Sequence, residues 1–136
     1  MTDPNVVYDF INNQITVDVV VDDHIVAGLP VLRPGQWNVT WKLISDLDLV
    51  FQPDDGIKID DGPNAPPALT HEELIRESDG HAVSIVFHNE CQSANAVSYF
   101  INLEPGPGSP DLEKRVAGLP LHHDPTLSVI SDPPAG

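Results

Sequence analysis

The alternation of apolar and polar residues is most regular between residues 14 and 22. Every second position there carries a β-branched apolar side chain: Ile15, Val17, Val19 and Val21. Residues 5–11 alternate in the same way. Between the two runs, Asn12-Asn13 fits a short turn because asparagine tolerates positive φ at little cost. An alternating pair of runs joined by such a turn predicts a β-hairpin.

The remaining apolar runs are short and are separated by turns rich in Gly and Pro. They predict strands at 37–44, 47–51, 82–88, 96–103 and 126–131, a brief extended piece at 57–59, and loops at 28–35, 52–68 and 105–120. Seven or eight short strands indicate an all-β protein, and an immunoglobulin-like antiparallel β-sandwich is the expected architecture. An open barrel is the alternative. We expect a single domain over residues 1–136, in which the last strand (about 125–132) follows the Pro/Gly-rich connection 105–120.

One segment carries a helix signal. Residues 70–77 begin with Thr70, Glu73 stands three residues later, and Gly80 lies just beyond the expected end. Thr at the N-cap with Glu at the third helical position forms a capping box. At most one short helix, of one or two turns, is therefore expected.

The charge of the chain is strongly negative. Asp and Glu number 21 against six Lys and Arg, which gives a formal net charge of -15. Charge of this sign repels phosphate backbones and anionic lipid surfaces, so nucleic-acid and membrane partners are not expected. A hydrophobic fraction of 40% favours a folded domain over a disordered chain. No apolar run of 18 residues occurs, and Met1-Thr2-Asp3-Pro4 lacks a signal-peptide pattern, so a cytoplasmic location is expected.

No residue pattern predicts a cofactor or a metal site. The loop pairs Asp22-Asp23, Asp54-Asp55 and Asp60-Asp61 could hold calcium, but the EF-hand spacing is absent and solvated turns are the preferred interpretation. The six histidines lack metal-ligand spacing, and a glycine-rich phosphate loop and a nucleophile elbow are both missing. The single cysteine, Cys91, has no evident base near it in sequence.

The dipeptide Asp-Pro is the remaining chemical signal, and it occurs at residues 3–4, 124–125 and 132–133. Its tertiary amide is easier to twist and protonate than an ordinary peptide bond, and the Asp carboxylate can attack its own backbone carbonyl. Asp124-Pro125 is the best placed of the three, because it precedes the predicted last strand. His122 and His123, directly before it, are candidate proton donors. An ordinary turn at the entry to that strand is the alternative.

The closing layout of the chain resembles the DP-EP family of small bacterial β-sandwich proteins. The resemblance rests on the strand pair AVSIVFHN and AVSYFINL, on Glu104-Pro105 at its end, and on Asp124-Pro125 before a short terminal strand. Members of that family are described as self-cleaving, self-assembling endopeptidases. The resemblance implies scission between Asp124 and Pro125, after which the Asp can join a lysine side chain through an isopeptide link.

The resemblance also suggests roles for particular residues. Asp124 would supply both the scissile carbonyl and the reacting carboxylate, and Pro125 would be the leaving amine. By the matching dipeptide, Glu104 would be the acid that activates water or protonates the proline nitrogen. The lysine is where the sequence departs from the pattern: residues 82–103 contain none, and Lys114 is the only lysine between Glu104 and Asp124.

Two functions are therefore open. The first is an autocatalytic endopeptidase that cuts its own Asp124-Pro125 bond and self-associates as a homo-oligomer. The second is a non-enzymatic binding or assembly module of the same fold, with calcium binding as a variant. Tyr8, Trp37, Trp41 and Tyr99 would be its partner anchors if they are exposed.

Overall fold

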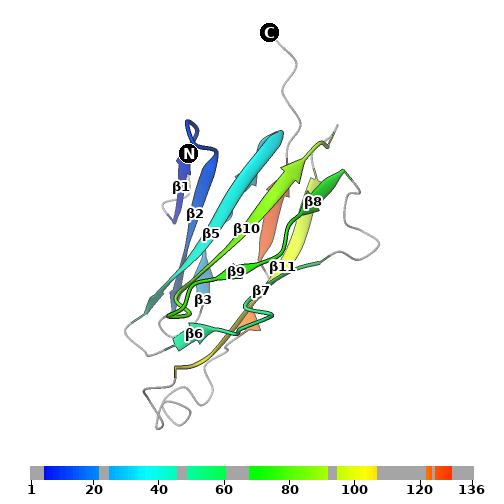
Figure 1. The fold of residues 1–136 in the computed structure, drawn as a ribbon. Helices are drawn as coiled ribbons and strands as arrows, with labels where there is room; N and C mark the ends of the chain where they lie inside the picture. The colour runs from blue at the N-terminus through cyan, green and yellow to red at the C-terminus, as the bar shows by residue number, and fades with distance from the viewer. Residues whose placement is uncertain are drawn as a thin grey trace.

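In the computed structural model the chain forms two β-sheets packed face to face (Figure 1). The structure describes residues 5–21, 25–45, 49–60, 68–91, 95–106, 122–123 and 125–129. All regular structure in these residues is β. The strands are β1 (Val6–Asp9), β2 (Gln14–Val21), β3 (Ile25–Ala27), β4 (Val31–Leu32), β5 (Gly35–Ser45), β6 (Leu49–Phe51), β7 (Ile57–Ile59), β8 (Leu69–His71), β9 (Ile75–Arg76), β10 (Ala82–Asn89), β11 (Asn95–Pro105), β12 (His122–His123) and β13 (Thr126–Val129).

The seven-stranded sheet is built on the long strands β2, β5 and β10, which lie side by side in Figure 1. Its order is β1-β2-β5-β10-β8, with β3 also paired to β2 and β9 to β10. β1 and β3 meet on the same edge of β2 at Asp18, whose N–H bonds to Asn5 and whose carbonyl accepts from Gly28. A Cβ at Gly28 would lie 2.5 Å from the Asn5 carbonyl oxygen, so only glycine fits this junction.

The six-stranded sheet is built on β11, which lies behind the first sheet in Figure 1. Ile101 of β11 pairs with Ile57 of β7 and also with His123 of β12, so β7 and β12 lie on opposite edges of β11. β6 follows β7 on the first edge. β13 pairs with β11 on the second edge and in turn pairs with β4.

The predicted all-β sandwich is confirmed, but with more strands than expected. Thirteen strands occur in the described residues, because the sheet edges are divided into pieces of two to four residues that are too short to show alternation. Two of the pairings, β2 with β5 and β13 with β4, are parallel, so the sheets are mixed rather than purely antiparallel. The last expected strand is described from Thr126 to Val129, and its remaining residues lie outside the described part.

The helix expected over residues 70–77 is wrong. The segment instead forms β8 and β9, two short edge strands that pair with β10. Its backbone continues this pairing between and after them, since the N–H groups of Glu72 and Glu77 donate to Val86 and Ala82. One helical turn carries a nucleation cost that few hydrogen bonds offset, whereas the edge of β10 offers partners already in place. Gly80, with φ of 75°, belongs to the turn from β9 to β10.

The predicted hairpin is confirmed as β1 and β2, and its turn is longer than expected. Asn13 has φ of 52°, as the turn requires. β1 ends at Asp9 rather than at Ile11, because the Asp9 carboxylate accepts hydrogen bonds from the N–H groups of Ile11 and Asn12 and from the Asn12 side chain. The side-chain bond from Asn12 is the main cause that lowers the pKa of Asp9.

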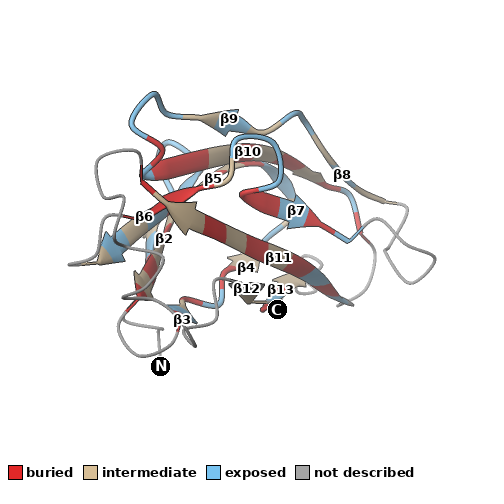
Figure 2. Cartoon of the chain, turned by 90° about the horizontal axis from the view of Figure 1, so that it is seen from below, coloured by how far each residue is buried: buried red, intermediate tan, exposed pale blue. Residues whose placement is uncertain are grey.

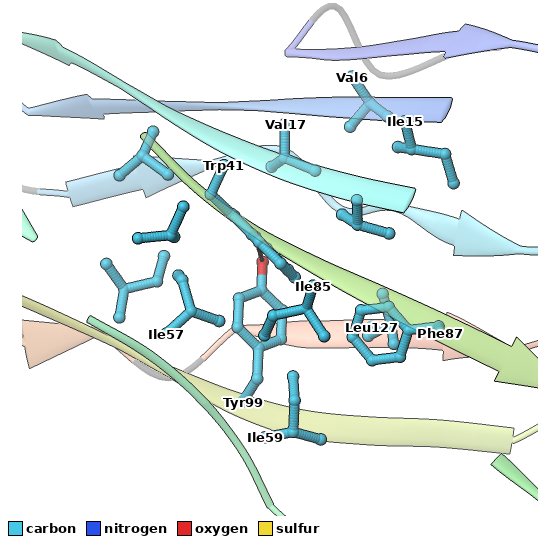
Figure 3. Close-up of a cluster of buried hydrophobic side chains, with 14 of the residues drawn as sticks. Val6, Ile15, Val17, Trp41, Ile57, Ile59, Ile85, Phe87, Tyr99 and Leu127 are labelled. Carbon is cyan, nitrogen blue, oxygen red and sulfur yellow. Dashed lines mark hydrogen bonds between the residues drawn. The ribbon is translucent and has the colours of Figure 1, made fainter. Parts of the chain in front are cut away.

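The core lies between the two sheets and centres on Trp41 and Tyr99 (Figure 3). Trp41 comes from β5 and Tyr99 from β11, and both are fully buried. Their ring centroids are 5.4 Å apart, and the Trp41 Nε1–H donates a hydrogen bond of 3.2 Å to the Tyr99 hydroxyl. A second polar link joins the sheets where the buried Asn89 amide donates to the Leu32 carbonyl. The two sheets therefore meet through an apolar layer that these two hydrogen bonds cross, while the buried Trp37 Nε1 has no hydrogen-bond partner among the described residues.

Burial of Tyr99 predicts a loss of stability at alkaline pH. Desolvation raises the pKa of Tyr99 to about 12 in the folded chain, against about 10 in the unfolded chain. The unfolded state ionises first, so the free energy of unfolding is unaffected below pH ~10 and falls by about 3 kcal/mol by pH ~12. The free energy of unfolding is measured across this pH range by denaturant unfolding, with tryptophan fluorescence as the signal. The Tyr99→Phe variant should lose this pH dependence, and the Tyr8→Phe variant should retain it. An equal effect of the two substitutions would show that the loss of stability does not come from Tyr99.

Candidate functional site

The described segments on both sides of residue 124 pair with β11. His123 of β12 pairs with Ile101, and Thr126 of β13 pairs with Ser98. Ser98 lies three positions before Ile101 on β11, and Thr126 lies three positions after His123. β12 and β13 therefore keep one register along β11. Pro125, the second residue of the Asp-Pro pair singled out from the sequence, falls inside this shared register.

Pro125 occupies a hydrogen-bonding position of the ladder. Its carbonyl accepts a bond of 3.0 Å from the Tyr99 N–H. In an antiparallel pair of this type, the second bond runs from the N–H of the opposite residue back to the first residue's carbonyl. Proline has no N–H, so Pro125 cannot donate that bond. The Tyr99 carbonyl thus faces the nitrogen of the Asp124-Pro125 bond without receiving a hydrogen from it.

β13 is fixed in the sheet by burial and by pairing on two sides. Pro125 is buried, and Leu127 and Val129 are completely so, while Thr126 is exposed on the opposite face. β4 pairs with β13 on the side away from β11, and the Ser128 N–H donates to the Pro30 carbonyl at 3.1 Å. The position of Pro125 is therefore set by the core and not only by local turn chemistry.

His123 lies on the same side of the sheet as Pro125. Directly paired residues of an antiparallel ladder share a face, and Ile101, the partner of His123, points into the core. Pro125 is two residues further on and therefore returns to this face. The His123 side chain is half-buried. The structure thus brings an imidazole to the core side of the strand that carries the Asp-Pro bond.

Glu104 is not brought to this bond. It follows Ile101 by three residues on β11 and therefore lies on the opposite face, half-buried and away from the core, a pattern visible as alternating colours along β11 in Figure 2. Tyr99, the partner of Pro125, is five residues away, or roughly 16 Å along an extended strand. A glutamate side chain does not span that distance.

Lys58 is a residue that sequence reasoning missed. It lies on β7, exposed, and pairs with Phe100. Phe100 stands between the β11 residues that pair with His123 and with Pro125. Lys58 is therefore about 10 Å, or two strand spacings, from the strand that carries the bond. Residue 58 is distant in sequence, and no local pattern could have indicated this neighbourhood.

Several candidates lie outside the described residues. These are Asp124, Lys114, and the loop acids Asp22, Asp23 and Asp61. Nothing is described of the His122 side chain, although its backbone belongs to β12. Within the described part of the chain, no three His, Cys, Asp or Glu side chains gather as metal ligands would. Two histidines there meet single carboxylates instead: His88 lies 2.9 Å from Glu72, and His81 lies 3.6 Å from Asp79.

The aromatic residues considered as partner anchors belong mainly to the core. Trp37, Trp41 and Tyr99 are buried, and Tyr8 is half-buried with its hydroxyl accepting a bond from the Val31 N–H. Cys91 is also buried, and desolvation raises the pKa of its thiol. These side chains therefore stabilise the fold rather than offer a surface or a nucleophile.

The chain matches no known family model and no curated protein. Across the residues described, no helix has the length and apolar character needed to cross a membrane.

The burial of β13 predicts that its core-facing residues hold Pro125 in place. Leu127→Ala should lower the free energy of unfolding by about 2–5 kcal/mol, because it removes fully buried methyl groups and leaves a cavity. Thr126→Ala, next to it on the exposed face, should change it by no more than about 0.5 kcal/mol. Urea unfolding of the two variants measures both values. Similar costs at the two positions would show that β13 is not packed as described.

Proposed function

We propose that this protein cleaves its own Asp124-Pro125 peptide bond, using the Asp124 carboxyl as the nucleophile. The observation that carries the proposal is the ladder position of Pro125, whose carbonyl is bonded to Tyr99 while its nitrogen cannot complete the pair. An isolated Asp-Pro bond is labile only in acid and heat. A fold that holds the chain on both sides of such a bond can restrict it to a reactive geometry.

The chemistry uses atoms already present in the dipeptide. The Asp124 side-chain oxygen attacks the Asp124 backbone carbonyl carbon, and a cyclic anhydride forms. The bond from that carbon to the Pro125 nitrogen breaks, its electron pair stays on the nitrogen, and the nitrogen takes a proton. Water then opens the anhydride and leaves Asp124 as a new C-terminus. The net reaction consumes one water and releases residues 125–136 as a peptide with an amino-terminal proline.

His123 is the proposed proton donor. Its side chain shares a face with Pro125, and histidine is the side chain that exchanges protons most readily near neutral pH. Glu104, roughly 16 Å along β11 from the partner of Pro125, is left out of the mechanism. If a lysine amine replaces water at the anhydride, an isopeptide bond forms and no water is consumed. Lys58, across β11, is the described lysine placed for that reaction.

The first test is the intact mass of the purified full-length chain during days at neutral pH. We expect conversion into two fragments that separate under denaturing conditions, and loss of this conversion in Asp124→Ala. Asp132→Ala, which removes the carboxylate of another Asp-Pro bond, should cleave like the wild type. A fragment of residues 1–124 that is one water lighter than the hydrolysed fragment, released together with residues 125–136, would indicate the isopeptide crosslink to a lysine of the same chain. A chain that stays at full length and full mass would refute the proposal.

The residue roles make a second, independent prediction. His123→Gln should slow cleavage by about a hundredfold or more, because the departing nitrogen loses its proton donor. Glu104→Gln should leave the rate unchanged. Rates are measured from the time course of the intact mass, with circular dichroism to verify that both variants are folded. A large loss in Glu104→Gln with none in His123→Gln would reverse the assignment.

An assembly function is the second candidate, and one surface favours it. Of seven exposed large apolar side chains in the described residues, five lie on β1, its turn, β3 or the turn after it: Val7, Phe10, Ile11, Val26 and Leu29. Residues 5–11 and 25–33 carry one acid, Asp9, and one base, Arg33, in a chain of net charge -15. A like-charged second copy can approach at such a neutral edge without strong repulsion.

The exposed edge predicts association through β1. Ile11, at the hairpin tip, is 93% exposed, and Ile75, on the opposite edge of the same sheet, is 66% exposed. Light scattering after size exclusion should show a concentration-dependent dimer that Ile11→Asp abolishes and the matched Ile75→Asp retains. A monomer at all concentrations, or equal effects of the two changes, would exclude this edge as the interface.

A further inference from the structure

The Tyr99 carbonyl faces a proline nitrogen across the β-ladder. The inference that follows rests on the proposed cleavage of the Asp124-Pro125 bond. Tyr99 bonds to Pro125 through its N–H, so its carbonyl points to the same edge of β11. The residue there is a proline, which has no hydrogen on its nitrogen. Tyr99 and Pro125 are both buried, which limits the access of water as a replacement donor. In the intact chain, the Tyr99 carbonyl oxygen therefore lacks the N–H of residue 125 that would complete the hydrogen-bonded pair.

Cleavage changes the hydrogen-bonding capacity of that one nitrogen. In the intact chain it is a tertiary amide nitrogen with no hydrogen. When its bond to the Asp124 carbonyl carbon breaks, it takes one proton from the acid and a second from solvent. The product is a secondary ammonium with two N–H groups, since amino-terminal amines have a pKa of about 8 and are largely protonated at neutral pH.

We propose that the Tyr99 backbone carbonyl accepts a hydrogen bond from the Pro125 amine released by cleavage, so that the cut completes the β-ladder and the terminal strand stays in the sheet. Tyr99 is then a positioning residue that acts through its main chain. A protonated nitrogen bonded to this carbonyl has no electron pair with which to attack the anhydride again. The same contact thus opposes re-formation of the Asp124-Pro125 bond.

The other contacts of the strand do not depend on the bond that is cut. Leu127 and Val129 remain buried, the ladder from Asn95 to Ser98 is unchanged, and β4 still pairs on the other side. A charge-assisted hydrogen bond from the new ammonium is stronger than the amide hydrogen bond that a residue other than proline would make at this position of the ladder. The nicked protein should therefore behave as one particle under native conditions, with the released peptide held through β13.

The first experiment tests the geometry without requiring cleavage. In a full-length Pro125→Ala chain, residue 125 regains an N–H at the position facing the Tyr99 carbonyl. We expect its amide to exchange with deuterium at least about a hundredfold more slowly than the new amide of Pro53→Ala, a matched substitution in an exposed turn. Equal exchange rates at the two substituted positions would overturn the inference.

The second experiment follows the product. Wild-type protein is allowed to cleave and is then examined by native mass spectrometry and size exclusion, with denatured samples in parallel. One native particle containing both fragments supports the inference. Release of residues 125–136 from a still-folded body overturns it and leaves the proposed cleavage intact. A chain that never cuts removes both the cleavage and its product, while amide exchange in the Pro125→Ala chain still reports whether the Tyr99 carbonyl faces residue 125.

Discussion

The contact between Trp41 and Tyr99 ties the two sheets together, and the rest of the structure depends on it. The Tyr99 hydroxyl oxygen accepts the indole N–H in a layer where water is excluded, so the Trp41 donor carries no unpaired desolvation cost. Because the two rings come from the central strands β5 and β11, their separation sets the spacing of the sheets around them (Figure 3). On either side of this contact, every second residue of these strands points into the same apolar layer.

The same residue joins the core to the proposed site. The Tyr99 side chain points inward, while its N–H and carbonyl point along the sheet to the strand that contains Pro125. A shift of the aromatic ring would therefore move the backbone that holds Pro125. β11 combines both roles because a strand sends its side chains perpendicular to the sheet and its hydrogen bonds within it. Pro125 is thus held by a strand whose own side chains form part of the core.

Local patterning predicted the parts of the fold that are determined locally. The hairpin at 5–22 follows from strict alternation and from Asn13, and the strands over 37–44, 82–88 and 96–103 follow from runs long enough to define two faces. The segment 70–77 misled because a capping box stabilises a helix only when no better set of backbone partners is available. The exposed edge of β10 supplied such partners. The parallel pairings of β2 with β5 and of β13 with β4 join distant segments and leave no trace in local sequence.

The sequence by itself determined the all-β class, the main strands and the presence of one labile Asp-Pro bond before the last of them. Those features depend on covalent chemistry and on side-chain periodicity, which are readable in order along the chain. The tertiary structure alone decided what faces that bond. Register on β11 places Tyr99 opposite Pro125, keeps His123 on the core side, puts Glu104 out of reach and introduces Lys58 from a distant strand. Register is set by how two sheets bury their apolar faces together, and that is a property of the whole fold.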